Sequence, residues 1–488
     1  MSIRRIAFGT AAMSMVNVLR LFVQFFAIPI LARKLSPTDY GLVGMAMPIL
    51  AFSMMIADAG IGMSLVRSSA TSQRVWSTCF WLSAVLGVVL SAGMIAAAPL
   101  AGRIMHQPEL SPIVMALALA LLIQAIAIIP SAMLQKRQQF NAIALIEIGS
   151  IAIGIGAAIA VATQNHGAWA LVIQQLSYAG VKLAATFLVS PFRPRFALDF
   201  SNVTEHLTFS RDILAINLIV FFTRSIDNLI IGAVLGAAAV GVYSMTWQFV
   251  RLPLMLVTGP LQYVLYAQLA NIKHDRAATR RLLLILTRLV ATLAFPTIGM
   301  IAVAHDSIFG VLLSKKWAES GDLFMMLAPV SALQAITAIA GTFVLSIGRT
   351  DIQIRWTTEC GIIWLIMLIA AVWSGLDCIA IAQSALAVLY APRLLALMLP
   401  LMGCDRVSYG KALLTPVMAS LLGMGGFIAI INSTHLGQFA QFCLAAALAA
   451  GCVALSVFFQ RAALVGEMSR RRGRDPTDNS VALNVLRP

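Results

Sequence analysis

The chain has 488 residues, of which 60% are hydrophobic and 11% charged, and its mean hydropathy is +0.90. This composition predicts a polytopic membrane protein and leaves no stretch for a soluble domain. The formal charge of +15 would suit a nucleic-acid-binding protein. Most basic residues instead fall in the loops and tails that flank the hydrophobic segments, so we expect no nucleic-acid partner.

The hydrophobic segments predict an all-α fold with about 14 transmembrane helices, because about 20 apolar residues cross a bilayer as a helix. The first set of predicted spans is 8–32, 41–65, 76–100, 113–134, 142–163 and 167–189. A polar connector follows. The second set is 212–235, 240–268, 282–304, 322–347, 356–374, 377–400, 411–432 and 438–460.

The distribution of basic residues predicts the orientation. With the amino terminus inside, most Lys and Arg fall in cytoplasmic loops and tails, and the outer loops hold only Arg33, Lys34, Arg103, Lys315 and Lys316. This asymmetry predicts an even number of spans with both termini cytoplasmic. The first hydrophobic run superficially resembles a signal peptide, but it is too long and too polar, so we expect a retained span.

An offset of 200 residues relates two outer turns of the chain. ILARKLSPTDYGLV from Ile30 and IGAVLGAAAVGVY from Ile231 align so that Leu35 falls on Leu235 and Gly41 on Gly241. Six spans and the connector have the same length, which predicts two six-helix lobes related by a parallel repeat. The expected organisation is an N-lobe at 1–190, a cytoplasmic connector at 191–211, a C-lobe at 212–400, two extra helices at 401–460 and a basic cytoplasmic tail at 461–488.

Three arginines, Arg20, Arg224 and Arg251, fall near the middle of predicted spans. Inserting a cation at that depth costs roughly 2.5 to 3.5 kcal/mol, so each side chain must face protein or water. An anion is the natural partner for all three.

The first span carries Ser14, Asn17, Arg20 and Gln24 at intervals of three, three and four, so these residues share one helical face. A polar stripe cannot face lipid, because lipid offers its polar groups no partner. The stripe predicts a lining for a central cavity, with Arg20 binding an anion there. The alternative is that Arg20 pairs with a carbonyl or carboxylate inside the protein.

The seventh and eighth spans hold the other deep arginines. On the seventh, Arg224 either pairs with Asp227 or faces the cavity with Asp227 and Asn228 setting its orientation. On the eighth, Trp247, Gln248 and Arg251 lie on a second polar face, which predicts a further cavity lining.

Shallower charges fall towards the cytoplasmic ends of their spans. Asp58, Glu147 and Lys182 are candidates for an inner gate, and snorkelling or structural ion pairing would explain them equally well. Gly60 and Gly62 follow Asp58 and predict an end to the second span. The basic tail, with Arg470 to Arg472, predicts contact with anionic lipid or, alternatively, with a protein.

Motifs typical of enzymes are absent from the sequence. It contains no phosphate-cradling GxxxxGK[ST] loop, no HExxH, and no clustered His and Cys ligands. The six cysteines show no metal or disulfide spacing. We therefore expect a transporter without a catalytic residue, cofactor or metal. A membrane glycosyltransferase is the enzyme alternative, although the loops are too short for one.

Several stretches resemble bacterial polysaccharide repeat-unit flippases of the multidrug/oligosaccharidyl-lipid/polysaccharide exporter superfamily. They are ILARKLSPTDYGLVGMAMPILAFSMMIADAGIGMSLVRSS from Ile30, FNAIALIEIGSIAIG from Phe140, GAWALVIQQL from Gly167, RSIDNLIIGAVLGAAAVGVYSMTWQFVRLP from Arg224, LLSKKWAESG from Leu312 and SIGRTD from Ser346. The resemblance covers about the first 350 residues.

This resemblance implies a two-lobed transporter in the bacterial inner membrane that moves undecaprenyl-diphosphate-linked oligosaccharides by alternating access. It implies a role in exopolysaccharide, capsule or O-antigen synthesis, with a polymerase and other glycan-assembly proteins as possible partners. The cationic cavity of the family corresponds by depth and face to Arg20, Arg224 and Arg251. The alternatives are a multidrug or organic-cation antiporter of the same superfamily and a non-transporting scaffold of glycan assembly.

Overall fold

The computed structural model describes residues 23–67, 72–196, 214, 217, 218, 221, 226–252 and 275–472. All regular elements in these ranges are helices, and eleven of them are long and apolar enough to cross a membrane. The remaining predicted spans, at 8–32, 212–235 and 240–268, include residues outside those ranges, and their described residues are helical. The predicted all-α, polytopic membrane fold is confirmed.

The helices divide between two compact units. The first unit comprises Met1–Phe249, Leu312–Leu323 and Thr357–Gln383, and the second comprises Val250–Val311, Phe324–Trp356 and Ser384–Pro488. Both units therefore draw on segments far apart in the sequence. The lobe boundaries expected from the repeat stay a prediction.

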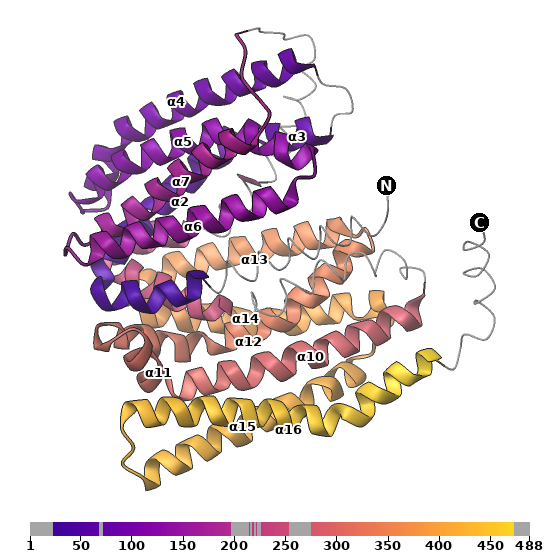
Figure 1. Cartoon of the computed structure of the whole chain (residues 1–488). Helices are drawn as coiled ribbons and strands as arrows, with labels where there is room; N and C mark the ends of the chain where they lie inside the picture. Colours follow the sequence, from indigo (N-terminus) through magenta and orange to yellow (C-terminus); the bar gives the residue numbers. More distant parts are fainter. Residues whose placement is uncertain are drawn as a thin grey trace, which may run out of the picture. The chain divides into compact units, whose positions relative to one another are not determined.

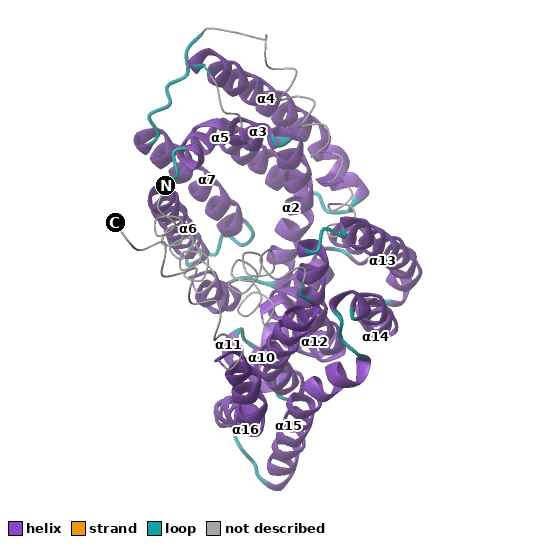
Figure 2. Ribbon diagram, turned by 90° about the vertical axis from the view of Figure 1, so that its right-hand side faces the viewer, coloured by secondary structure: helices purple, strands orange, loops and turns teal. Residues whose placement is uncertain are grey.

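Six labelled helices of the first unit follow one another along the chain. In Figure 1, α4 packs along α5, and in Figure 2 α6 and α7 are neighbours. The core between α3, α4 and α5 is apolar and includes Trp76, Phe80 and Ile129. The bounds are α2 Pro37–Asp58, α3 Ile61–Arg67, α4 Gln73–Ile104, α5 Leu110–Lys136, α6 Phe140–Ala162 and α7 Trp169–Val189.

The later helices include a group in which α10, α15 and α16 pack on one another (Figure 1). Long helices such as α12 to α14 contribute segments to both units. The bounds are α10 Arg276–Val303, α11 His305–Leu312, α12 Ala318–Ser346, α13 Thr350–Ala371, α14 Leu376–Met398, α15 Arg406–Ser433 and α16 Gln438–Arg472. Short 3₁₀ turns lie at Lys315–Trp317, Val372–Ser374 and Pro400–Met402.

The second predicted span begins earlier than its hydropathy suggests and contains a break. α2 starts at Pro37 because Ser36 and Asp39 form a capping box, in which each side chain binds the other's backbone N–H. α2 ends where Ala59 adopts the left-handed conformation, followed by Gly60 at φ 74°. α2 thus ends next to Gly60, but helix resumes as α3 and the candidate span continues to Arg67, so the predicted end is an interruption of the span.

The last predicted span also continues further than hydropathy suggests. α16 runs from Gln438 to Arg472, whereas the apolar window ends at Gln460. Residues after 460 include Arg, Ala, Leu and Glu, which favour helix in polar surroundings. The helix therefore extends into the segment expected to form the basic tail.

The 200-residue offset also appears as a contact. A Cβ atom on Gly41 of α2 would overlap the carbonyl oxygen of Ala237, and a Cβ on Gly241 would overlap the carbonyl oxygen of Pro37. Residues 37 and 237, and 41 and 241, are each 200 apart, so the contacts are reciprocal, as a local twofold relation requires. We call residues 37–44 and 237–244 the glycine seam.

Trp317 fixes the segment Leu312–Leu323 to the first unit. Its side chain is fully buried, and its indole Nε1 donates a hydrogen bond of 2.9 Å to the carbonyl oxygen of Ala32. Its ring meets the edge of Tyr40, with the centroids 5.2 Å apart. A residue of a predicted outer loop thus lies against the turn that leads into the glycine seam.

Candidate functional site

The predicted anion-binding residues are only partly covered by the described ranges. Arg20, Arg224 and Asn17 lie outside the described residues. Arg251 lies in helical residues 237–252, and Gln24 lies in helical residues 23–34. Both side chains are exposed in the isolated chain. Their roles in binding an anion or lining a cavity stay predictions.

The helical residues 23–34 pack against α6 and α7. Ala27 forms an apolar cluster with Ile151 and Ile155, and Tyr178 of α7 packs against the same cluster. Because Gln24 precedes Ala27 by three residues, both lie on one face of the helix. Of the predicted polar stripe, only Gln24 lies within the described residues, and its side chain is exposed beside this contact.

Close to this contact, three polar side chains form a triad across α6 and α7. Lys182 Nζ lies 3.0 Å from Glu147 Oε2. The Tyr178 hydroxyl donates to Glu147 Oε1 at 2.9 Å and accepts from Lys182 Nζ at 2.9 Å. The ammonium also lies 5.2 Å from the Tyr178 ring centroid. The structure thus brings together the predicted gate residues Glu147 and Lys182.

Asp58, the third gate candidate, occupies a different place. It is the last residue of α2, directly before the break at Ala59 and Gly60, and its side chain is half-buried. A Cβ on Gly62 would lie 3.7 Å from Asp58 Oδ1, so α3 begins close to this carboxylate. The gate role of Asp58 stays a prediction.

Asp227 and its neighbour Asn228 are held by groups that belong to the glycine seam. Asp227 Oδ2 accepts a hydrogen bond of 3.0 Å from the hydroxyl of Tyr243, whose side chain is 1% exposed. The Asn228 side chain donates to the carbonyl oxygen of Gly44 at 3.3 Å and to Ser244 Oγ at 3.4 Å. Asp227 therefore has a fixed position with Tyr243 as one partner.

Two other residues expected to line the cavity, Trp247 and Gln248, lie in helical residues 237–252, which also contain Tyr243. Trp247 is buried, and its ring lies at an angle to that of Tyr243, with centroids 6.1 Å apart. Gln248 is half-buried. The structure thus places Trp247 in packing contact within the first unit, and the lining role of both residues stays a prediction.

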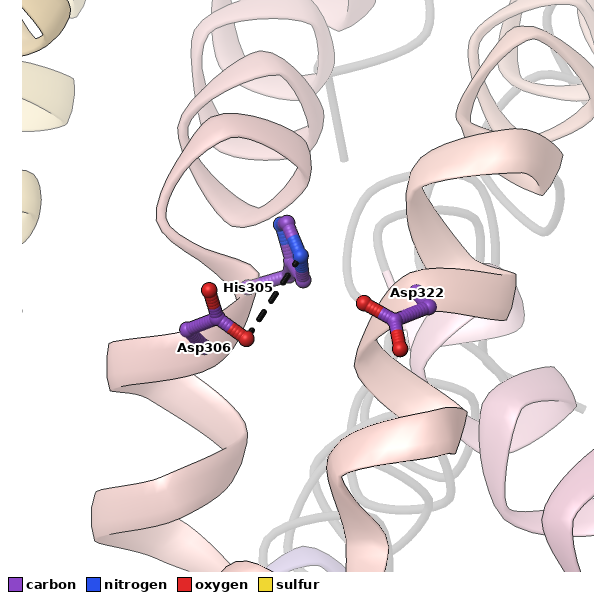
Figure 3. Close-up of side chains that lie close together, drawn as sticks. All are labelled: His305, Asp306 and Asp322. Atoms are coloured by element: carbon purple, nitrogen blue, oxygen red, sulfur yellow. Dashed lines mark ion pairs between the residues drawn. The ribbon is translucent and has the colours of Figure 1, made fainter.

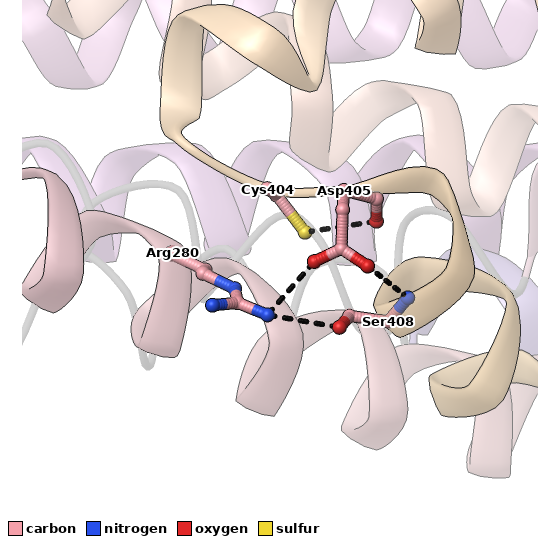
Figure 4. A network of polar contacts seen from close by, with 4 residues as sticks. All are labelled: Arg280, Cys404, Asp405 and Ser408. Atoms are coloured by element: carbon pink, nitrogen blue, oxygen red, sulfur yellow. Dashed lines mark hydrogen bonds and ion pairs between the residues drawn. The ribbon is translucent and has the colours of Figure 1, made fainter.

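A capping network of the second unit joins the start of α15 to α10 (Figure 4). Asp405 accepts a hydrogen bond of 2.8 Å from the Ser408 backbone, and Arg280 donates to Asp405 Oδ1 at 2.8 Å and to Ser408 Oγ at 2.9 Å. The bonds from Ser408, with the nearby Arg280 charge, lower the pKa of the Asp405 carboxyl. Burial raises the pKa of the neighbouring Cys404 thiol.

Another group of ionisable residues lies where α10 meets α11 (Figure 3). His305 Nδ1 lies 2.9 Å from the carbonyl oxygen of Ala302, and His305 Nε2 lies 3.7 Å from Asp306 Oδ1. Both residues belong to the second unit, whereas Asp322 belongs to the first.

Sequence reasoning missed the two tyrosines. Tyr178 and Tyr243 each hydrogen-bond a carboxylate on a different helix, Glu147 and Asp227 respectively. Nothing in their local spacing identifies these partners. The one available signal was an ionisable residue in a neighbouring span, which needs a hydrogen-bond donor at membrane depth.

Comparison with known proteins places this fold. A lipid II flippase, MurJ, in an inward closed conformation matches 94% of this chain and 99% of its own, with a TM-score of 0.72 and 12% sequence identity. The chain therefore has the fold of this class of membrane protein.

Sequence comparison then gives the family. The model of the polysaccharide biosynthesis protein family matches residues 30–322. The teichuronic acid biosynthesis protein TuaB of Bacillus subtilis is 26% identical over 88% of this chain and 90% of its own length. The succinoglycan biosynthesis transport protein ExoT of Rhizobium meliloti is 26% identical over 62% of both chains. This chain belongs to the polysaccharide biosynthesis protein family, as its resemblance to the exporter superfamily implied.

Proposed function

We propose that this protein is a flippase that moves undecaprenyl-diphosphate-linked oligosaccharides across the bacterial inner membrane. The observation that carries the proposal is the family match over residues 30–322, together with a fold shared with a lipid II flippase over 94% of the chain. The names of TuaB and ExoT connect these relatives to polysaccharide synthesis and transport. Exopolysaccharide, capsule or O-antigen synthesis is the corresponding process here.

The proposed substrate matches the charge of the chain. A diphosphate carries about two negative charges, and an arginine donates paired hydrogen bonds to phosphate oxygens while keeping its own charge when desolvated. Arg20, Arg224 and Arg251 are the proposed binding residues, and of these Arg251 lies within the described residues, where its side chain is exposed. A cation near the middle of a span is then compensated by its ligand.

The proposed mechanism is alternating access. The diphosphate binds the arginines from the cytoplasmic side while the polyprenyl chain stays in lipid, and a rearrangement of the helices then exposes the glycan outside. Both termini are cytoplasmic in this proposal, and the basic segment near Arg470 contacts anionic lipid. A polymerase and other glycan-assembly proteins are the proposed partners.

The test is a flipping assay in proteoliposomes with a lipid-diphosphate-linked oligosaccharide. Replacing Arg20, Arg224 or Arg251 by Ala should slow delivery to the opposite leaflet by about tenfold each, because a hydrogen bond to a charged group contributes about 1.5 to 3 kcal/mol. Arg103→Ala is the matched control, since Arg103 is exposed near the end of α4. Unchanged flipping in all three variants at normal protein levels would refute the arginine site.

A further inference from the structure

The triad of Glu147, Tyr178 and Lys182 contains an ion pair between Glu147 and Lys182. The two residues lie on α6 and α7, which are each long and apolar enough to cross a membrane. Ionisable groups at such positions are rare and usually serve a function or pair with each other. This pair is not sealed in the core, because the side chain of Lys182 is 30% exposed and that of Glu147 is 21% exposed. Both charged groups are therefore partly open at the surface of the chain.

The triad lies beside the first helix of the proposed binding region. Tyr178 packs against the cluster of Ala27, Ile151 and Ile155, and Glu147 precedes Ile151 by one helical turn on α6. Gln24 precedes Ala27 on the facing helix. The triad thus adjoins the contact that residues 23–34 make with α6 and α7.

The triad holds a cation whose present anionic partner can be exchanged for an anionic ligand. Lys182 is held by a carboxylate and a phenol, so its charge is balanced while no ligand is present. The Tyr178 hydroxyl donates a separate hydrogen bond to Glu147 Oε1. If Lys182 turned to another oxyanion, Glu147 would keep one hydrogen-bond donor, which lowers the cost of separating the pair.

We propose that Lys182 binds an oxyanion of the transported glycan lipid and that Glu147 occupies Lys182 in the empty protein. The inference rests on the proposed flippase function. The oxyanion is either the lipid diphosphate or the carboxylate of an acidic sugar, since an ammonium recognises both as a point charge. Glu147 is a positioning residue in this arrangement, because it acts on the ligand only through Lys182.

Binding measurements on the purified full-length protein in nanodiscs test the proposal with two probes, farnesyl diphosphate and trigalacturonate. Lys182→Gln should weaken binding of the recognised probe about tenfold, whereas Lys182→Arg should retain most of it. Glu147→Gln should tighten binding about twofold to fivefold, because a partly exposed, competing ion pair is removed. A purely structural carboxylate would weaken binding when replaced.

The double variant Glu147→Gln/Lys182→Gln separates direct from indirect effects. If Glu147 acts through Lys182, its replacement changes nothing once Lys182 is neutral, so the double variant should bind like Lys182→Gln alone. An equal effect of Glu147→Gln in both backgrounds would overturn the proposal. If Glu147→Gln does not fold, the contrast between Lys182→Gln and Lys182→Arg decides.

The two probes and a parallel flipping assay keep the conclusions apart. Loss confined to farnesyl diphosphate assigns the diphosphate to Lys182, and loss confined to trigalacturonate assigns the acidic sugar. A wild-type protein that flips the lipid-linked glycan, with unchanged probe binding in Lys182→Gln, refutes only the role of Lys182. A wild-type protein that neither flips the glycan nor binds a probe refutes the proposed function as well.

Discussion

The glycine seam and the triad both join neighbouring helices of the first unit, but they do so by opposite means. At the seam, Gly41 and Gly241 bring two backbones so close that neither position has room for a Cβ atom. In the triad, long side chains bridge α6 and α7 and remain partly exposed. Close packing of the two backbones therefore fixes the glycine seam. Electrostatic attraction holds the triad, in which the charged groups can exchange partners.

The largest expected effect is a steric one at the seam. Gly41→Val should lower the free energy of unfolding by about 3 kcal/mol, because added atoms would overlap the carbonyl of Ala237 and force the backbones apart. The measurement is thermal unfolding of the purified protein in detergent. Gly93→Val is the matched control, since a Cβ on Gly93 meets nothing within 4 Å. Equal destabilisation by both variants would contradict a steric seam.

A smaller effect is expected for Tyr243, a polar residue of the seam. Tyr243→Phe removes the hydrogen bond to Asp227 and should cost about 1 kcal/mol, because it leaves a half-buried carboxylate with one donor fewer. Thermal unfolding in detergent measures it. Tyr390→Phe serves as the control, because the Tyr390 ring packs on Trp356 and its hydroxyl makes no hydrogen bond within the described residues. A stability equal to wild type in Tyr243→Phe would show that this bond contributes nothing.

The triad should contribute less to stability than to binding. Glu147→Gln/Lys182→Gln is expected to change the free energy of unfolding by under about 1 kcal/mol, because partly exposed ion pairs contribute little and Gln can still hydrogen-bond Tyr178. The exposed pair of Arg349 and Asp351, neutralised in the same way, gives a matched reference in the same unfolding assay. A loss of unfolding free energy as large as that expected for Gly41→Val would mean that the ion pair and the backbone packing at the seam stabilise the first unit equally.

The sequence predicted the elements better than their contacts. Hydropathy predicted the ends of α5 and α6 to within three residues. It could do so because the hydrophobicity that allows a segment to cross lipid is a property of that segment alone. The 200-residue offset identified Gly41 and Gly241 as equivalent, but equivalence does not reveal that the two residues touch. That contact depends on how two helices are rotated about their axes, which one sequence does not specify.

The candidate site was predictable in its residue types and not in its pairings. Glu147 and Lys182 were recognised as charges near the inner ends of their spans, but their partnership depends on the packing of α6 against α7. The tyrosine partners were missed for the same reason. A hydrogen bond between helices is determined by rotation and depth together, and hydropathy reports only the depth.

The smallest expected effect is at the capping network, because the charged side chains of Arg280 and Asp405 are exposed to solvent. Because hydrogen bonds from Ser408 and the Arg280 charge lower the pKa of Asp405, the ionised carboxylate stabilises the folded state. That contribution is complete above the ordinary carboxyl pKa of about 3.9 and is lost as the pH falls through the lower folded value. Asp405→Asn should therefore unfold at a slightly lower temperature than wild type at pH 7, and the difference should disappear in acid. Glu109→Gln is the control, because Glu109 precedes α5 without a capping side-chain bond. A difference for Asp405→Asn that stays constant down to the most acidic pH would show that this network acts through packing, as the glycine seam does, and not through its charge.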